Sequence, residues 1–313
     1  MQLFLDIVNI VLPVFLVIGL GYLLQRIRLI DQPFLLQTNR LVFYVCLPLL
    51  LFYKIGQADF VSNFNPTLIL GSMLVIVLVF VAAYFWGLIR KDPPAIRGSF
   101  TQAAFRSNLA YMGLAIAFNA YGDEGLTRAG ILMGFLVPVL NLFAILALTL
   151  PHRQHNRSEP GLWLRQLALN PLIIASFAGI LWSFLKLPLP LLVDRGLKIA
   201  TGMTLPLALL AIGGSFSLTR LKGDLFQALA ATGFKTVLMP LLATLLLVLL
   251  GVRGMDLGIG IIFAGAPSAT ANYIMAQQLK GDAELAGSTV MLSTLVSALT
   301  YTIALLLLRS YAT

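Results

Sequence analysis

The chain has 313 residues, of which 59% are hydrophobic and only 11% are charged, whereas a soluble domain carries about 25% charged residues. These proportions exclude an ordinary soluble domain and predict a polytopic membrane protein. The net charge of +9 does not indicate a nucleic-acid partner, because the Lys and Arg residues lie mainly in short segments between apolar runs, where they act as topology signals.

Apolar runs follow one another along the whole chain, separated by short connections. Because about 20 apolar residues cross a bilayer, we predict that each run forms one span. Basic residues follow the first run and do not precede it, which favours a membrane span over a cleaved signal. The ten predicted spans are Leu3–Leu24, Leu41–Ile55, Pro66–Ile89, Phe100–Tyr121, Leu126–Leu150, Pro171–Leu185, Leu197–Phe216, Leu225–Leu250, Leu257–Leu279 and Leu285–Leu308.

The longest hydrophilic segment, HRQHNRSEPGLWLR at 152–165, divides the spans into two sets of five. We therefore expect two halves, 1–150 and 170–313, joined by a cytoplasmic linker at 151–169. Alternate connections share a side of the membrane, and one set holds twelve Lys and Arg residues against seven in the other. This excess places the first set in the cytoplasm, so we expect a multi-pass protein of the cell (inner) membrane with both termini extracytoplasmic.

Short motifs recur between the two halves. The pattern LPLxL occurs at 47–51 and again at 205–209, and the pair Gly-Asp occurs at 122–123 and 281–282, so the offsets are 158 and 159 residues. Five spans per half would give the second half the opposite membrane orientation. The sequence therefore predicts two inverted five-helix repeats.

Two predicted spans, the fourth and the ninth, contain residues that interrupt helices or bind freed backbone groups. These stretches are 104–123 and 264–282; both contain Gly, Asn and Ser, and the second also contains Pro and Thr. Irregular backbone at membrane depth is tolerated where it lines a cavity inside the protein, so we expect broken, crossing helices around a transport site. The candidate substrate-binding residues are Arg106, Asn108, Tyr111, Gly113, Pro267, Ser268, Thr270 and Asn272 in these stretches, together with Lys235 in the eighth predicted span. Gly265 and the recurring prolines Pro48 and Pro206 are the expected supports of the breaks.

Charge placement narrows the chemistry of this site. Every Asp and Glu falls in a connection or at the end of a span, which excludes a proton relay or a sodium cage built on intramembrane carboxylates. Two cations, Arg106 and Lys235, do lie inside spans, where an unpaired charge costs about 3 kcal/mol or more. Two interpretations stay open for them: they face the cavity and bind an anionic substrate, or they bond carbonyls of the broken helices or reach the interface. For Asn141, helix packing is the favoured interpretation.

No pattern of catalysis or cofactor binding is found in the sequence. Cys46 is the single cysteine, so a disulfide or a cysteine-based metal site within one chain is excluded, and no phosphate-binding loop or HExxH motif occurs. We expect no enzyme activity, no cofactor and no metal.

Four blocks of the chain resemble the auxin efflux carrier family, which includes bacterial relatives of plant PIN-type auxin transporters. The blocks are LPVFLVIGLGYLLQRIRLI near the start, NRLVFYVCLPLLLF from Asn39, RSNLAYMGLA from Arg106 and APSATANYIMAQQLKGDAELAGSTVMLSTLVS from Ala266. They cover nearly the whole chain in the family's order. The resemblance implies an all-α membrane protein of ten helices in two inverted repeats, with a scaffold and a transport domain, similar to bile-acid symporters and sodium/proton antiporters.

The resemblance also bears on single residues. Asn108 falls at the family's crossover asparagine and Pro267 at the proline that opens the second break. Two positions depart from the pattern: Ala115 stands where many members have proline, and Asn272 where plant members have a second proline. The added amide of Asn272 allows a smaller or more polar anion than an indole acid.

We therefore predict a secondary transporter that exports an organic anion, a carboxylate or auxin-like acid, by elevator or rocking alternating access. Uniport is the simplest mechanism, since an inside-negative potential drives an anion outward by about 2.3 kcal/mol per charge per 100 mV. The alternatives are a sodium- or proton-coupled dicarboxylate permease of the malate or malonate kind, and a membrane receptor that binds a small molecule. A homodimer is expected from the resemblance.

Overall fold

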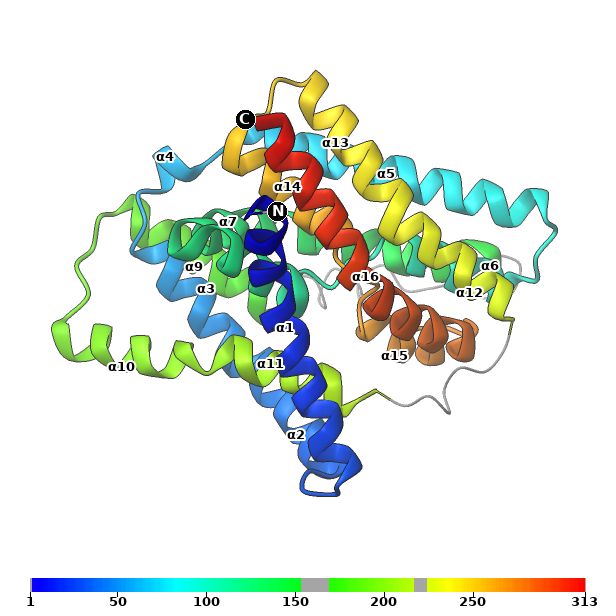
Figure 1. The fold of residues 1–313 in the computed structure, drawn as a ribbon, viewed down its shortest axis with the longest axis horizontal. Coiled ribbons are helices and arrows are strands. Elements are labelled where there is room, and N and C mark those ends of the chain that lie inside the picture. The colour runs from blue at the N-terminus through cyan, green and yellow to red at the C-terminus, as the bar shows by residue number, and fades with distance from the viewer. Residues whose placement is uncertain (1, 153–168, 217–223, 313) are drawn as a thin grey trace.

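The computed structural model describes residues 2–152, 169–216 and 224–312 (Figure 1). Within these ranges the chain is helical, without any β-strand beyond one isolated bridge. Seven of the described helical stretches are long and apolar enough to cross a membrane. The composition predicted this all-helical membrane class. Most of the expected linker 151–169 lies outside the described ranges.

The first half consists of long helices interrupted by short π-helical turns. Its elements are α1 (Gln2–Arg26), α2 (Gln32–Leu41), the π-helical turn η1 (Val42–Cys46), α3 (Leu47–Gly56), α4 (Phe60–Asn63), α5 (Pro66–Ile89), α6 (Pro94–Phe105), the π-helical turn η2 (Leu109–Gly113), α7 (Leu114–Thr149) and the 3-10 turn η3 (Leu150–His152). Inside α7 the backbone kinks at Gly122, which has φ 63° and ψ −150°.

The second half follows a similar order of elements. These are α9 (Pro171–Phe184), α10 (Leu191–Gly202), α11 (Thr204–Gly214), α12 (Leu225–Gly233), the π-helical turn η5 (Phe234–Leu238), α13 (Met239–Leu249), α14 (Gly254–Gly265), α15 (Ala271–Gln278) and α16 (Ala283–Ala312). In Figure 1, α5 and α13 lie side by side along one edge of the molecule, while α10 and α3 lie together at the other.

Polar residues before the apolar runs determine where several helices begin. The side chain of Asp31 accepts a hydrogen bond from the first turn of α2 at 2.9 Å, and that of Asn65 from the first turn of α5 at 3.0 Å. Asn170 and Asp224 cap α9 and α12 in the same way. Such caps satisfy amide groups that have no partner within the helix.

Glycines allow α1 and α11 to pack with their backbones in contact. A Cβ atom added to Gly21 would lie 2.2 Å from the carbonyl oxygen of Leu210, and one added to Gly213 would lie 1.8 Å from that of Ile18. Side chains larger than hydrogen do not fit at these two positions. Small residues at helix contacts are the usual device for close packing in a membrane, where apolar side chains gain little by leaving lipid.

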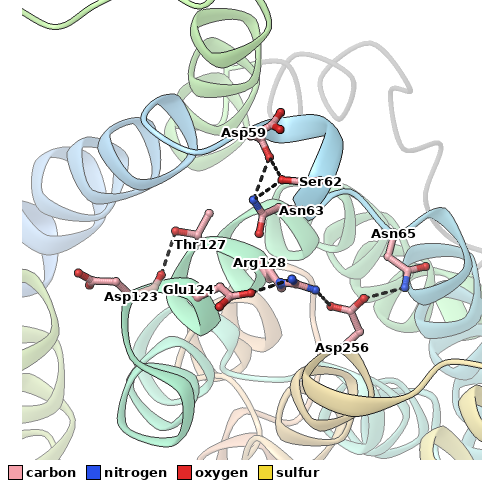
Figure 2. Close-up of polar contacts among 9 residues, drawn as sticks. All are labelled: Asp59, Ser62, Asn63, Asn65, Asp123, Glu124, Thr127, Arg128 and Asp256. Carbon is pink, nitrogen blue, oxygen red and sulfur yellow. Dashed lines mark hydrogen bonds and ion pairs between the residues drawn. The ribbon is translucent and has the colours of Figure 1, made fainter.

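Charged side chains meet at the end of the bundle near the kink of α7. Figure 2 shows the Arg128 guanidinium between two carboxylates, Glu124 at 2.7 Å and Asp256 at 2.9 Å. Asp256 also accepts a hydrogen bond of 2.7 Å from Asn65, at the start of α5. This network ties α5, α7 and α14 together outside the apolar core.

Two spans begin earlier than the sequence predicted. The helical stretches run over Gln32–Gly56 and Leu191–Gly214, whereas the predicted spans were Leu41–Ile55 and Leu197–Phe216. Hydropathy underestimates both helices because their first turns carry polar residues, which are tolerated at a span end but lower its apolar average.

Candidate functional site

Both stretches that the sequence marked as interrupted are breaks between helices. The helix α6 ends at Phe105, and Arg106 takes extended dihedrals of φ −78° and ψ 97° before η2 begins. The helix α14 ends at Gly265, and Ala266 has φ −58° and ψ 139°. Ala266 precedes Pro267, and the proline ring disfavours a helical conformation at the residue before it. No proline opens the first break, so its conformation depends on its neighbours.

The two breaks pair with each other through their backbones. Ser107 and Ser268 form an isolated antiparallel bridge, with hydrogen bonds from Asn108 N to Pro267 O at 2.8 Å and from Ala269 N to Arg106 O at 2.9 Å. Each segment thus supplies partners for polar groups that the other break exposes. Without such pairing, free amides and carbonyls in the apolar interior would each cost several kcal/mol.

Side chains from three helical regions meet at the guanidinium of Arg106. Its Nη1 donates to Asn272 Oδ1 at 3.0 Å and its Nη2 donates to Asn141 Oδ1 at 2.8 Å. Asn272, which is fully buried, donates in turn to Ser268 Oγ at 2.7 Å. Among the described residues, no carboxylate lies within 4 Å of this guanidinium.

The half-buried Arg106 therefore keeps its charge uncompensated and has donors to spare. A guanidinium carries five N–H groups, and the two asparagine oxygens take two of them. Neutral amides orient the group without neutralising it. The arrangement is suited to hold an anion that approaches the remaining N–H groups.

Asn108 and Tyr111 lie beside this cluster on the first break. Asn108 is 7% exposed, and its side-chain amide has no hydrogen-bond partner among the residues that the structure describes. The Tyr111 hydroxyl donates to Asn39 Oδ1 at 3.2 Å and so connects η2 to α2. Asn108 lies two residues after Arg106 on the same break, and its amide can both donate and accept hydrogen bonds, which makes it the second candidate for ligand contact.

A small cavity lies on the side of the breaks that faces α5 and α13. Its volume of about 20 Å³ has room for about one water molecule. The hydroxyls of Ser72 and Ser107 line it, and neither has a partner among the described residues. The remaining lining residues are mostly apolar. This cavity is too small for an organic anion.

Lys235 takes a different position from Arg106. It lies on η5, is fully buried, and its ammonium donates to the carbonyl oxygen of Ala264 and, at 3.4 Å, to the sulfur of Met239. The sequence left two interpretations open for the cations inside spans. In this structure Lys235 bonds a carbonyl group of a broken helix, as the second interpretation expects.

The remaining predicted residues shape the breaks. A Cβ atom on Gly113 would lie 3.0 Å from the ring of Phe263, so η2 approaches α14 closely at this glycine. Gly265 ends α14, and Thr270 is half-buried just before α15. Pro267 and Ser268 are buried in the paired segment.

Pro48 and Pro206 lie in the first turns of α3 and α11, away from the paired segments. The two regions meet where Thr204 donates a hydrogen bond of 3.2 Å to the carbonyl oxygen of Cys46. The helix α11 also contacts η2 of the first break.

Two contributors to the site did not follow from sequence reasoning. Asn141, expected to serve in helix packing, is one of the two partners of Arg106, and Asn39 is the partner of Tyr111. Asn141 is a polar residue in an apolar helix, and that signal alone does not distinguish a site residue from a packing residue. Asn39 lies among several other polar residues of α2, so nothing in the local sequence marks it.

Comparisons with known proteins agree on one class. The family described as Membrane transport protein matches residues 6–305. A "Putative malonate transporter" of Rhizobium meliloti is 28% identical over 315 residues, covering 98% of this chain and 97% of the relative. Two further relatives are named uncharacterized transporters. That of Methanothermobacter thermautotrophicus is 24% identical and covers 95% of this chain and 96% of its own length. That of Methanocaldococcus jannaschii is 22% identical and covers 93% of this chain and 95% of its own length.

Proposed function

We propose that this chain, which belongs to the auxin efflux carrier family of membrane transport proteins, is a secondary carrier that moves a small organic anion through the paired helix breaks. The observation that carries the proposal is the Arg106 guanidinium, which two neutral amides hold beside the bridge and no described carboxylate neutralises. The relatives that match over almost their full length are named transporters, which supports a transporter over a membrane receptor.

An anionic substrate follows from the charges around the breaks. Helix N-termini bind anions because their first amide groups lack partners, and both η2 and α15 begin at the breaks. Arg106 adds a full positive charge and the unpartnered amide of Asn108 adds hydrogen-bonding groups. We propose that these groups, with Tyr111, Gly113, Pro267, Ser268, Thr270 and Asn272 around them, form the substrate site.

We propose ten membrane crossings. The helical stretch Leu109–His152 has 44 residues, which corresponds to about 66 Å of helix and about twice the thickness of a bilayer core. The kink at Gly122 divides it: the part before the kink completes the broken crossing that begins with α6, and the part after the kink forms the next crossing. The pairs α6 with η2 and α14 with α15 supply the two broken crossings, and α9 supplies one whose preceding residues lie outside the described ranges.

Repeat symmetry is supported by helix positions. The helices α2, α5 and α6 begin at residues 32, 66 and 94, and α10, α12 and α14 begin at 191, 225 and 254, so the offsets are 159, 159 and 160. The contacts of α1 with α11 and of α3 with α9 are equivalent under this pairing. We propose that 1–150 and 170–313 are inverted repeats joined by the linker 151–169.

Alternating access requires one body to move against another. We propose that α1–α3 and α9–α11 form the scaffold and that the other helices form the transport domain, which carries both breaks. One contact between these bodies is the ion pair of Lys54 on α3 with Asp123 beside the kink, at 2.6 Å. The count of basic residues supports an extracytoplasmic position for this pair and for both termini, and we propose that the protein is located in the inner membrane.

For substrate and coupling we propose a carboxylate exported by uniport. The malonate in the name of the Rhizobium relative supports a short dicarboxylate. Coupling to sodium would need oxygen ligands such as the hydroxyls of Ser268 and Thr270, and Ser268 already accepts the amide of Asn272. A homodimer is proposed from family kinship.

The test is flux of radiolabelled malonate in proteoliposomes under an imposed membrane potential, with sodium or choline as the external cation. We expect saturable flux that follows the potential and is the same in both salts. Flux that requires sodium would support the coupled permease instead. Saturable binding of malonate to the purified protein without flux would support a receptor.

A further inference from the structure

The carbonyl end of α14 is the feature that the transport proposal leaves without a role. A helix ends with carbonyl groups that lack a partner within the helix, and together they carry a partial negative charge. At α14 this end is buried at the second break, where water does not reach it. Two side chains from other helices bond it: the Tyr301 hydroxyl donates to Ile262 O at 3.0 Å, and the Lys235 ammonium donates to Ala264 O.

Lys235 is held there without any acidic partner. It is 0% exposed, and the turn η5 that carries it packs against α14, α16, α5 and α6. Among the described residues, no carboxylate lies within 4 Å of its Nζ. The negative end of α14 and the sulfur of Met239 are therefore the groups that face the ammonium.

We propose that Lys235 is a built-in substitute for a bound monovalent cation at the carbonyl end of α14. An ammonium group on a side chain supplies the charge that a sodium, potassium or ammonium ion would bring. Because it is covalently attached to the protein, it cannot leave the site as a free ion can. The paired breaks therefore keep their geometry in the absence of such ions. Tyr301 contributes a neutral hydrogen bond to the same turn and does not supply charge.

Shortening the Lys235 side chain should create a binding site for a cation. Lys235→Ala removes the charge and leaves the α14 carbonyl exposed to the space that the lysine chain filled. Carbonyl oxygens are ligands for hard monovalent ions, and the helix end attracts any cation. This consequence concerns stability and does not depend on which substrate the chain carries.

The experiment is thermal unfolding of the purified protein in choline chloride, followed by titration with ammonium, sodium or potassium chloride. In choline we expect the unfolding midpoint of Lys235→Ala to lie about 5 °C below that of the wild type. At least one of the three cations should raise it again in a saturable manner. The matched control is Tyr301→Phe, which loses the other bond to α14 but keeps the ammonium; it and the wild type should show no saturable rise.

Each other outcome overturns the proposal. It fails if Lys235→Ala unfolds at the wild-type midpoint in choline, if none of the three cations stabilises the variant, or if the wild type shows the same saturable rise. Should Lys235→Ala not fold in choline, purification in ammonium, sodium and potassium chloride decides: recovery of folded protein in any one of them supports the proposal, and failure in all three overturns it. Because the readout is unfolding, absence of malonate flux would refute the proposed function without touching this result.

Discussion

Replacing Arg106 by glutamine tests the proposed anion site most specifically. The change removes the positive charge and leaves a side chain that still donates hydrogen bonds. In the folded protein Arg106 donates to Asn272 and Asn141, so Arg106→Gln is expected to lose at least one of these two bonds. A buried amide oxygen left without a partner costs about 1–3 kcal/mol, and some loss of thermal stability is therefore expected.

The expected effect on binding is larger than that of a neutral substitution elsewhere. A hydrogen bond between a charged donor and an anion contributes about 1.5–3 kcal/mol. Loss of about 2 kcal/mol corresponds to a Kd about 30-fold higher for the anion. Arg106→Lys keeps the charge but lacks the planar fork that engages two amides at once, so its Kd should lie between those of the wild type and Arg106→Gln.

The assay is equilibrium binding of malonate, or of the carboxylate that most raises the unfolding midpoint, to purified protein. Arg128→Gln is the matched control, because Arg128 is paired with Asp256 and Glu124 at the end of the bundle. We expect the control to lose stability and to bind with a Kd within about twofold of the wild type. Wild-type affinity in a folded Arg106→Gln would refute the reasoning.

Three further predictions concern other residues. Asn108→Ala should leave the unfolding midpoint unchanged, since its amide has no described partner, and should raise the anion Kd up to about 10-fold; a lower midpoint with an unchanged Kd would assign it a structural role. Lys54→Met removes the ion pair with Asp123, worth about 0.2–1 kcal/mol, so the rate of malonate exchange should change by up to about fivefold at constant Kd, and a changed Kd would contradict this. Gly21→Ala should destabilise the protein by about 1–3 kcal/mol in thermal unfolding, whereas Gly19→Ala, whose added Cβ meets no atom within 4 Å, should not; equal effects would argue against the close α1–α11 contact.

Composition and the order of apolar runs predicted the class of the molecule. The family resemblance read from four blocks is confirmed by the match over residues 6–305. The breaks were readable because Pro267 and the polar residues around it are incompatible with an uninterrupted membrane helix.

Other features depend on contacts between distant segments and do not follow from local sequence. The first break has no proline, and it stays open through backbone bonds to residues about 160 positions later. The partners of Arg106 likewise come from Asn141 and Asn272, and no spacing rule connects them. Whether Lys235 contacts carbonyls or a cavity was decided by how η5 packs on α14, which the sequence left open.

The most direct measurement is an experimental structure of the protein with the bound carboxylate. We expect density for the anion at the paired breaks, with a carboxylate oxygen about 3 Å from the Arg106 guanidinium and within hydrogen-bond reach of the Asn108 amide. Density for the ligand at any other place, with Arg106 still bonded to Asn272 and Asn141 alone, would contradict it.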